Sequence, residues 1–227
     1  MSLFDSQLTG RLRLRHLREV HEAKDEEMAE QRPRFHKLAR EDSAPQVFSA
    51  FNLFPTPPAL ADKVIELADI HYGHHILEPS AGTGRLLDAI VRRFNHHVES
   101  GLVKRFSDLH IQVTAVEIDG PMWHHLSDSP YAMWVTARNA DFLTWETHER
   151  FDRIVMNPPF KMGRDIKHIR RAIQWLKPGG KLVAICANGP KQNEQLKPLA
   201  AHWEVLPEGS FKEAATNVSA ALFVFDK

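Results

Sequence analysis

The chain has 227 residues, 43% of them hydrophobic, and its 29 basic residues balance its 29 acidic residues. This length and composition suffice for one well-buried core, and the balanced charge excludes a generally basic coat, so any polyanion contact needs a local patch. The single cysteine, Cys186, excludes an internal disulfide framework and a multi-cysteine zinc site. No apolar run reaches the about 20 residues of a membrane span and no signal-peptide core is present, so a cytoplasmic protein without membrane contact is expected.

The first 50 residues differ in composition from the rest of the chain. Residues 11–42 carry many charges of both signs and contain no glycine, which predicts a charged helical N-terminal arm over residues 1–50, interrupted near Pro33. The basic start of this arm has the charge to touch phosphates, although a solvated helix surface is the simpler explanation. Residues 51–227 form the second predicted domain.

Predicted strands and helices alternate along this second domain. Strands are predicted at residues 75–78, 111–118, 133–137, 152–157, 181–187, 203–206 and 219–225. Helices are predicted at residues 58–69, 84–97, 120–128, 164–176 and 191–201. Several strands are continuous apolar runs, as in strands covered on both faces. The pattern predicts an α/β fold, a Rossmann-like, doubly wound, mostly parallel seven-stranded sheet whose last two strands form a C-terminal antiparallel hairpin.

A glycine-containing loop, 78-EPSAGTG-84, follows the first predicted strand. Gly82 and Gly84 allow a ligand to approach the backbone closely, and the helix that follows directs its amide groups there. A Gly-x-Gly pair is weak evidence alone, because ordinary strand–turn–helix geometry also produces it.

Two acidic residues make this loop stronger evidence for a ligand-binding site. Glu78 ends the first strand and Glu117 ends the second, where a carboxylate suits a ribose hydroxyl pair. The third glycine of a dinucleotide fingerprint is missing, and Glu117 follows later than the about 20 residues typical of such sites. Glu78 would repel a pyrophosphate but can accept hydrogen bonds from an ammonium group. The predicted cofactor is therefore a positively charged nucleoside without phosphate, S-adenosylmethionine.

Asp141 and Phe142 follow the third predicted strand. At this position a carboxylate can accept from an adenine amino group, and an aromatic ring can flank the adenine. A helix-cap or turn role explains Asp141 almost equally well.

The fourth predicted strand runs into 154-IVMNPPF-160. Proline cannot donate to a sheet ladder and restricts the residue before it, so the strand must end at Met156 or Asn157. The result is a stiff turn that carries an amide and a benzyl ring.

The order EPSAGTG, VEID, ADF and NPPF resembles class I S-adenosylmethionine-dependent methyltransferases of the amino-group type, above all the N6-adenine DNA methyltransferases. The segment 54–68 resembles that family's N-terminal cofactor motif, and 178–190 and 207–225 resemble its late strand motifs. The resemblance is closest to compact methylases of phages and mobile elements. It implies that S-adenosylmethionine contacts the following residues: Phe54, Thr56, Pro57, Glu78, Pro79, Ala81, Gly82, Gly84, Glu117, Ile118, Asp141, Phe142 and Asn157. For Thr56, an N-cap followed by proline is a complete structural alternative.

The resemblance also implies methyl transfer to the N6 amino group of adenine in DNA, catalysed around Asn157, Pro158, Pro159 and Phe160. The amine is a poor nucleophile because its lone pair is delocalised into the ring. The Asn157 side-chain oxygen and the Pro158 carbonyl can accept its two N–H bonds and aim the lone pair, held in place by the stiff prolines. Phe160 is expected to stack on a flipped-out base, a contact worth about 1–3 kcal/mol.

DNA is the expected partner, with RNA as an alternative. Candidate nucleic-acid contacts beside the turn are Lys161, Arg164, Lys167, Arg171 and Phe211. A solvated outer face of the predicted helix 164–176 explains the cations about as well. Only about 20 residues, 190–210, separate the last motifs, so we expect relaxed or short sequence specificity, or recognition by the N-terminal arm or a partner chain.

Two further alternatives remain open at this point. One is methyl transfer to an RNA base or to a protein glutamine amide, although glutamine enzymes commonly carry Tyr where this chain has Phe160. The other is a non-catalytic cofactor-binding or anti-restriction module. Cys186 lies in the middle of a predicted strand and is expected in the core, which argues against cytosine-C5 chemistry. The histidines show no metal-ligand pattern and are expected on the surface.

Overall fold

The computed structural model describes residues 55–99, 106–128, 134–211 and 218–227. The predicted N-terminal arm and Phe54 lie outside these residues. The helices are α2 (Pro58–Ala68), α3 (Arg85–Glu99), α4 (Gly120–Ser127), α5 (Arg164–Gln174) and α6 (Pro190–Gln195), with 3-10 turns η1 (Phe106–Leu109), η2 (Lys161–Gly163) and η3 (Lys197–Leu199). The strands are β1 (His75–Glu78), β2 (Gln112–Glu117), β3 (Val135–Asn139), β4 (Phe151–Met156), β5 (Leu176–Ala187), β6 (His202–Val205) and β7 (Ala220–Asp226).

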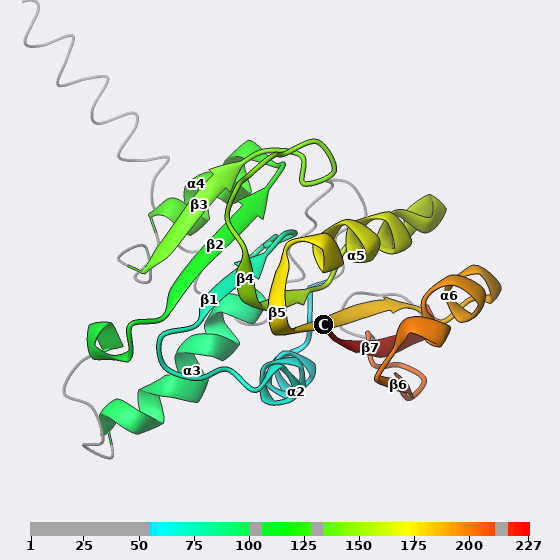
Figure 1. The fold of residues 1–227 in the computed structure, drawn as a ribbon, viewed down its shortest axis with the longest axis horizontal. Helices are drawn as coiled ribbons and strands as arrows, with labels where there is room; N and C mark the ends of the chain where they lie inside the picture. The colour runs from blue at the N-terminus through cyan, green and yellow to red at the C-terminus, as the bar shows by residue number, and fades with distance from the viewer. Residues whose placement is uncertain (1–54, 100–105, 129–133, 212–217) are drawn as a thin grey trace, which may run out of the picture. The chain divides into compact units, whose positions relative to one another are not determined.

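The seven strands form one sheet in the order β3-β2-β1-β4-β5-β7-β6 (Figure 1). Strands β1 to β5 pair in parallel, and β7 lies antiparallel between β5 and β6. This confirms the predicted mostly parallel sheet with an antiparallel C-terminal hairpin. The hairpin is inserted with its second strand inward, so β6 forms the edge of the sheet.

Helices cover both faces of the sheet, because successive strand residues point to opposite sides. Ile76, with Val155 and Val183, packs on the side of α2 and α3. Leu77 and Ile154 point to the other side, where they meet the apolar face of α5. Figure 1 shows α2 and α3 on one side of the sheet and α5 on the other. The doubly wound arrangement predicted from the alternating pattern is thus confirmed.

Two predicted boundaries are wrong for identifiable reasons. The helix predicted at 164–176 ends at Gln174, because Leu176 already pairs with Phe151 and begins a longer β5. The helix predicted at 191–201 breaks into α6 and η3, since Pro198 removes a backbone donor and clashes with the preceding turn.

The carboxyl ends of the parallel strands meet at one edge of the sheet. After β3 the chain crosses back to β4 beside β1, so the strand order reverses between β1 and β4. In open α/β sheets, ligands bind at this switch point, outside the carboxyl ends of the strands. The loop after β1 and the turn after β4 therefore lie at the same edge of the sheet. Among the described residues, no helix has the length and apolarity to cross a membrane.

Candidate active site

The carboxylate of Glu117 closes the glycine loop. Its two oxygens accept from two backbone amides, Gly82 N at 2.6 Å and Asp119 N at 2.8 Å. Gly82 (φ 54°) and Gly84 (φ 80°) adopt left-handed conformations, which explains why glycine stands at both positions. A carboxylate has about four lone-pair sites, so Glu117 retains acceptor capacity for a further ligand. Ile118, next along the chain, is 60% exposed beside it.

Glu78 is a buried acid with one carboxyl oxygen that has no hydrogen-bond partner in the described part of the chain. Its side chain is 1% exposed, and among the described residues Oε2 accepts no hydrogen bond. Burial, and then the nearby carboxylates of Glu117 and Asp88, raise the pKa of Glu78 well above its ordinary range. The neighbouring Ser80 hydroxyl is also buried and unpaired within the described part of the chain. A buried, unsatisfied acid is costly, so this loop fits a ligand that brings a cationic donor.

Asn157, at the end of β4, contacts the segment that precedes α2. Its Nδ2 donates to Thr56 Oγ1 at 3.0 Å, across 101 positions of sequence, and Thr56 is 4% exposed. The alternative N-cap role for Thr56 is wrong: Pro57 occupies the cap position and no side chain caps the helix. Pro158 is buried and Pro159 is half-buried, so the turn is held by packing as well as by its rings.

Both aromatic candidates for base contacts lie in the core. Phe160 is 9% exposed and packs edge-to-face on Phe211, with ring centroids 6.3 Å apart. Phe211 is 1% exposed, so this ring is buried and its nucleic-acid contact stays a prediction. The Phe160 ring packs in the core on the α2–α3 side of the sheet, and its stacking on a base likewise stays a prediction.

The segment after β3 combines a turn with core packing. Asp141 Oδ1 accepts from Leu143 N at 2.9 Å, and the Asp141 carbonyl accepts from Thr144 N and Trp145 N, which confirms its turn role. Phe142 is 2% exposed and packs edge-to-face on Trp175, so its ring lies in the core, and its contact with a cofactor ring stays a prediction.

The predicted phosphate contacts separate into two groups. Arg171 donates from Nε to the Phe142 carbonyl and from Nη2 to the Trp145 carbonyl, and its guanidinium lies 4.9 Å from the Trp175 ring, so Arg171 is a structural residue. Lys161 and Lys167 are exposed and form no ion pair with another described residue. Arg164 lies between these cases, because its Nη2 is 3.8 Å from Asp141 Oδ2.

A buried hydrogen-bonded acid, Asp165, was not anticipated. It is fully buried and accepts from Ala187 N at 3.0 Å and from Gln192 Nε2 at 2.9 Å. Burial raises its pKa. These bonds join the start of α5 to the end of β5 and to α6, next to the turn at Asn157. In the sequence Asp165 resembles an ordinary first-turn acid, and no pattern signals its partners.

Two other expectations concern the remaining chemistry-bearing side chains. Cys186 is fully buried, as predicted, and burial raises the pKa of its thiol. His168 is also buried, contrary to the expected surface placement, because it stacks on Phe142 and its Nδ1 bonds the Arg164 carbonyl. In the described ranges, no group of three or more His, Cys, Asp and Glu side chains is placed to hold a metal ion.

Solved structures share this doubly wound fold. The fold is similar to that of TrmN from Thermus thermophilus, at 22% identity and a TM-score of 0.54, over 75% of this chain and 48% of that one. It is also similar to a modification subunit of a putative type I restriction enzyme from Vibrio vulnificus, at 16% identity and a TM-score of 0.60, over 88% and 48%. The chain belongs to the methyltransferase small domain family, which its residues 45–212 match. Membership of this family supports S-adenosylmethionine as the cofactor.

Three curated relatives are methyltransferases according to their names. The tRNA1(Val) (adenine(37)-N6)-methyltransferase of Glaesserella parasuis is 25% identical over 166 residues, covering 61% of this chain and 65% of that protein. The type II methyltransferase M.TthHB8I of Thermus thermophilus is 38% identical over 105 residues, covering 46% and 20%. A tRNA1(Val) (adenine(37)-N6)-methyltransferase of Vibrio parahaemolyticus is 33% identical over 99 residues, covering 43% and 37%. The chain thus spans less than two thirds of the length of each of these relatives.

Proposed function

We propose that this chain transfers the methyl group of S-adenosylmethionine to the N6 amino group of an adenine in a nucleic acid. The observation that carries this proposal is that two features lie at the same edge of the sheet. These are the acid-flanked glycine loop after β1 and the Asn-Pro-Pro turn after β4. The names of the adenine-N6 relatives support the same amine.

The cofactor-binding half of the proposal rests on Glu78 and Glu117. The Glu78 Oε2 atom, which has no partner among the described residues, is suited to accept from the ammonium group of the methionine moiety. Glu117, already oriented by Gly82 N and Asp119 N, is suited to accept from the ribose hydroxyls. When bound, S-adenosylmethionine supplies a methyl group on a positively charged sulfur.

The catalytic half rests on Asn157 and Pro158. The Asn157 side-chain oxygen and the Pro158 carbonyl accept the two N–H bonds of the amine and so localise its lone pair on nitrogen. This nitrogen would be placed to take the methyl group from bound S-adenosylmethionine. The bonding pair of the broken carbon–sulfur bond would remain on sulfur, and one proton would pass from the nitrogen to water. Acceptors held in place by a stiff turn need little reorganisation during this step.

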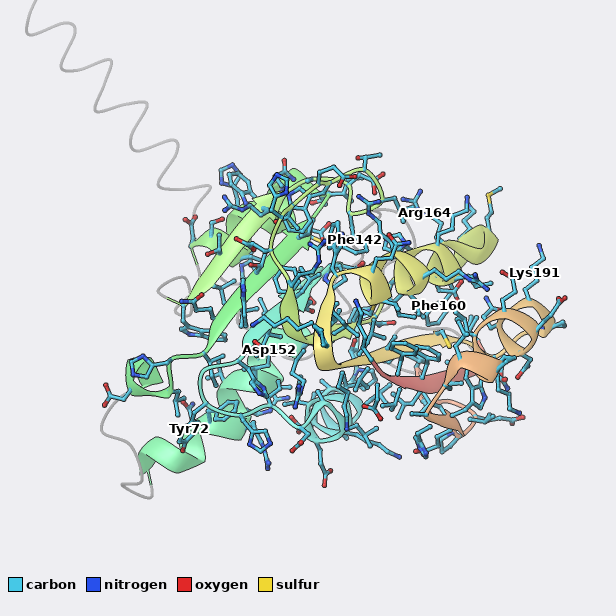
Figure 2. All side chains as sticks on the ribbon, in the orientation of Figure 1. Tyr72, Phe142, Asp152, Phe160, Arg164 and Lys191 are labelled. Atoms are coloured by element: carbon cyan, nitrogen blue, oxygen red, sulfur yellow. The ribbon has the colours of Figure 1, made fainter. Side chains whose placement is uncertain are left out.

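Nucleic-acid binding rests on cations beside the turn. Lys161 and Lys167 flank it from η2 and α5, and the Asp165–Gln192 bond brings α6, with the exposed Lys191, to the same place. Figure 2 shows Arg164 and Lys191 on these two neighbouring helices. In a chain without net charge, such a local group is what a phosphate backbone requires.

DNA is the polymer that we propose from the Asn-Pro-Pro-Phe resemblance, and the type II relative supports it. RNA is the second candidate, because the tRNA relative from Glaesserella parasuis matches a larger share of this chain than the type II enzyme does.

One assay tests this function. The pure protein is incubated with methyl-labelled S-adenosylmethionine and, in separate reactions, with unmethylated DNA, unmodified RNA or total protein. The products are then hydrolysed and identified. Labelled N6-methyladenine from DNA supports the proposal in full, and the same product from RNA alone moves it to the second candidate. Label on glutamine, or tight cofactor binding without transfer to any substrate, contradicts it.

A further inference from the structure

The contact between Thr56 and Asn157 bears on how the proposed acceptor is oriented. A carboxamide has nearly the same shape after a half-turn that exchanges its oxygen and nitrogen, yet only the oxygen accepts a hydrogen bond. An amine that met the carboxamide nitrogen would face a hydrogen-bond donor, which cannot accept either of its N–H groups. The orientation of Asn157 therefore has to be set before the substrate arrives.

Thr56 lies where it can set the orientation of the Asn157 carboxamide. Its hydroxyl oxygen accepts from Asn157 Nδ2 at 3.0 Å, so the nitrogen arm of the carboxamide is directed toward Thr56 and the oxygen arm away from it. Thr56 is 4% exposed, so water does not compete effectively for this bond. Pro57, which follows, has no N–H, and the hydroxyl caps no helix amide.

The fold also keeps Thr56 in place independently of Asn157. The Pro57 carbonyl accepts from Ala61 N at 2.9 Å in the first turn of α2, and Leu60, Ala61 and Val64 anchor this helix in the core. The two ends of the hydrogen bond thus belong to separate rigid segments, α2 with its proline start and the end of β4. A hydrogen bond between two rigid segments restrains the orientation of the Asn157 side chain.

We propose that Thr56 is a positioning residue: by holding the nitrogen arm of Asn157, its hydroxyl fixes the oxygen arm as the acceptor for the substrate amine. The inference rests on the proposed function and gives Thr56 a role distinct from contact with the cofactor. It also explains why the proline-rich segment before α2 and the Asn-Pro-Pro turn act as one unit although they lie far apart in sequence.

Three variants test the proposal. Thr56→Val keeps the shape and removes the hydroxyl, Thr56→Ser keeps the hydroxyl, and Thr114→Val is the matched control. Like Thr56, Thr114 is 4% exposed, and its substitution by Val also removes one side-chain contact, that with His75 Nε2 at 3.2 Å. Unlike Thr56, it lies within β2 and not at the carboxyl end of that strand. For each variant, kcat, KM for the nucleic acid and the cofactor Kd are measured.

Thr56→Val is expected to lower kcat about 3- to 10-fold, the effect of one neutral hydrogen bond, with the cofactor Kd within about twofold of the native value. Thr56→Ser restores kcat, and Thr114→Val leaves it unchanged. In an Asn157→Ala background, Thr56→Val has no further effect on kcat. A weakened cofactor Kd with native kcat at saturation overturns the proposal and assigns Thr56 to the cofactor instead.

A second readout does not depend on activity. NMR of the side-chain amide of Asn157 reports exchange of its Nδ2 protons with water, and the bond to Thr56 should slow exchange of one of them. Thr56→Val should abolish that protection, while Thr114→Val should not. Equal exchange in native protein and Thr56→Val overturns the positioning role. If the native enzyme methylates no amine, the proposed function fails, while the orientation of Asn157 is still decided by this measurement.

Discussion

The backbone amide of Gly82 donates to the carboxylate of Glu117 over 2.6 Å, which ties the loop after β1 to the end of β2. The second oxygen of Glu117 accepts from Asp119 N, the residue that caps α4. One carboxylate thus fixes the shape of the glycine loop and the start of a helix. The same group is the proposed ribose acceptor, so cofactor binding and loop geometry depend on the same side chain.

Glu117→Gln tests this dual role. The substituted amide has only one acceptor oxygen, so one of the two backbone donors, at Gly82 or Asp119, loses its partner. We expect a loss of about 1–3 kcal/mol in the free energy of unfolding and a cofactor Kd weakened about 10- to 100-fold, measured by denaturation and calorimetry. Glu66→Gln, on the exposed face of α2, is the control and should change neither quantity. A native cofactor Kd in Glu117→Gln would remove Glu117 from the site.

Glu78 should make stability depend on pH. Its pKa in the folded chain is raised, chiefly by burial, above the ordinary value of 4.5 that applies after unfolding. Between these values the folded chain holds a proton that the unfolded chain has released. Stability from this group therefore falls as pH rises above about 4.5, by at most about 1.4 kcal/mol per pH unit. Glu78→Gln should remove this decline, so its stability advantage over the native chain grows with pH. Parallel pH profiles of the two proteins would contradict the assignment.

The same carboxyl should couple cofactor binding to proton release. A cationic ligand favours ionised Glu78, so the cofactor Kd should fall as pH rises, up to the pH at which Glu78 is ionised without ligand. Below that pH, cofactor binding should release a proton. Calorimetry in buffers of different ionisation enthalpy measures the released proton. Glu78→Gln should bind weakly and release none.

Lys167 and Arg171 lie on the same helix and should respond differently to truncation. Lys167→Ala should weaken nucleic-acid binding and lower the slope of log Kd against log salt by about one, with native stability. Arg171→Met should instead lower the free energy of unfolding by about 1.5–3 kcal/mol, because the carbonyls of Phe142 and Trp145 lose a charged donor. If Lys167→Ala leaves the salt slope unchanged, α5 does not contact phosphates.

Asp165 should be important for stability although it is not in the proposed chemistry. Asp165→Asn places a donor against Ala187 N or the Gln192 amide, which leaves a buried polar group unsatisfied. We expect a loss of about 1–3 kcal/mol in denaturant unfolding. Asp62→Asn, which removes only an exposed ion pair with Arg92, should cost less than about 1 kcal/mol. Equal losses in the two variants would contradict a structural role for the Asp165 network.

The sequence predicted what depends on strand ends and their order. Glu78, Glu117 and Asn157 each lie at the end of a predicted strand, and parallel strands bring their carboxyl ends together, so their placement at one edge of the sheet followed from topology alone. The alternation of apolar runs and amphipathic segments likewise determined the layers of the fold.

What the sequence did not predict depends on partners that are distant in sequence or belong to the backbone. An aromatic residue after a strand can fill a core or face a ligand, and Phe142, Phe160 and Phe211 all fill the core. Arg171 donates to two carbonyls, and a carbonyl is present at every residue and so leaves no pattern. Thr56 bonds a residue 101 positions away, whereas the local reading favoured a helix cap.

The central claim is that Asn157 acts on the substrate amine while the glycine loop holds the cofactor, and Asn157→Ala tests it most directly. Transfer of labelled methyl to nucleic acid and the Kd for S-adenosylmethionine are measured on the same protein. We predict that kcat falls at least about 10²- to 10³-fold, as for the loss of a preorganised catalytic hydrogen bond, with the cofactor Kd within about threefold of native. Loss of cofactor binding as severe as that caused by a Gly82 substitution, or transfer at close to the native rate, would contradict the account.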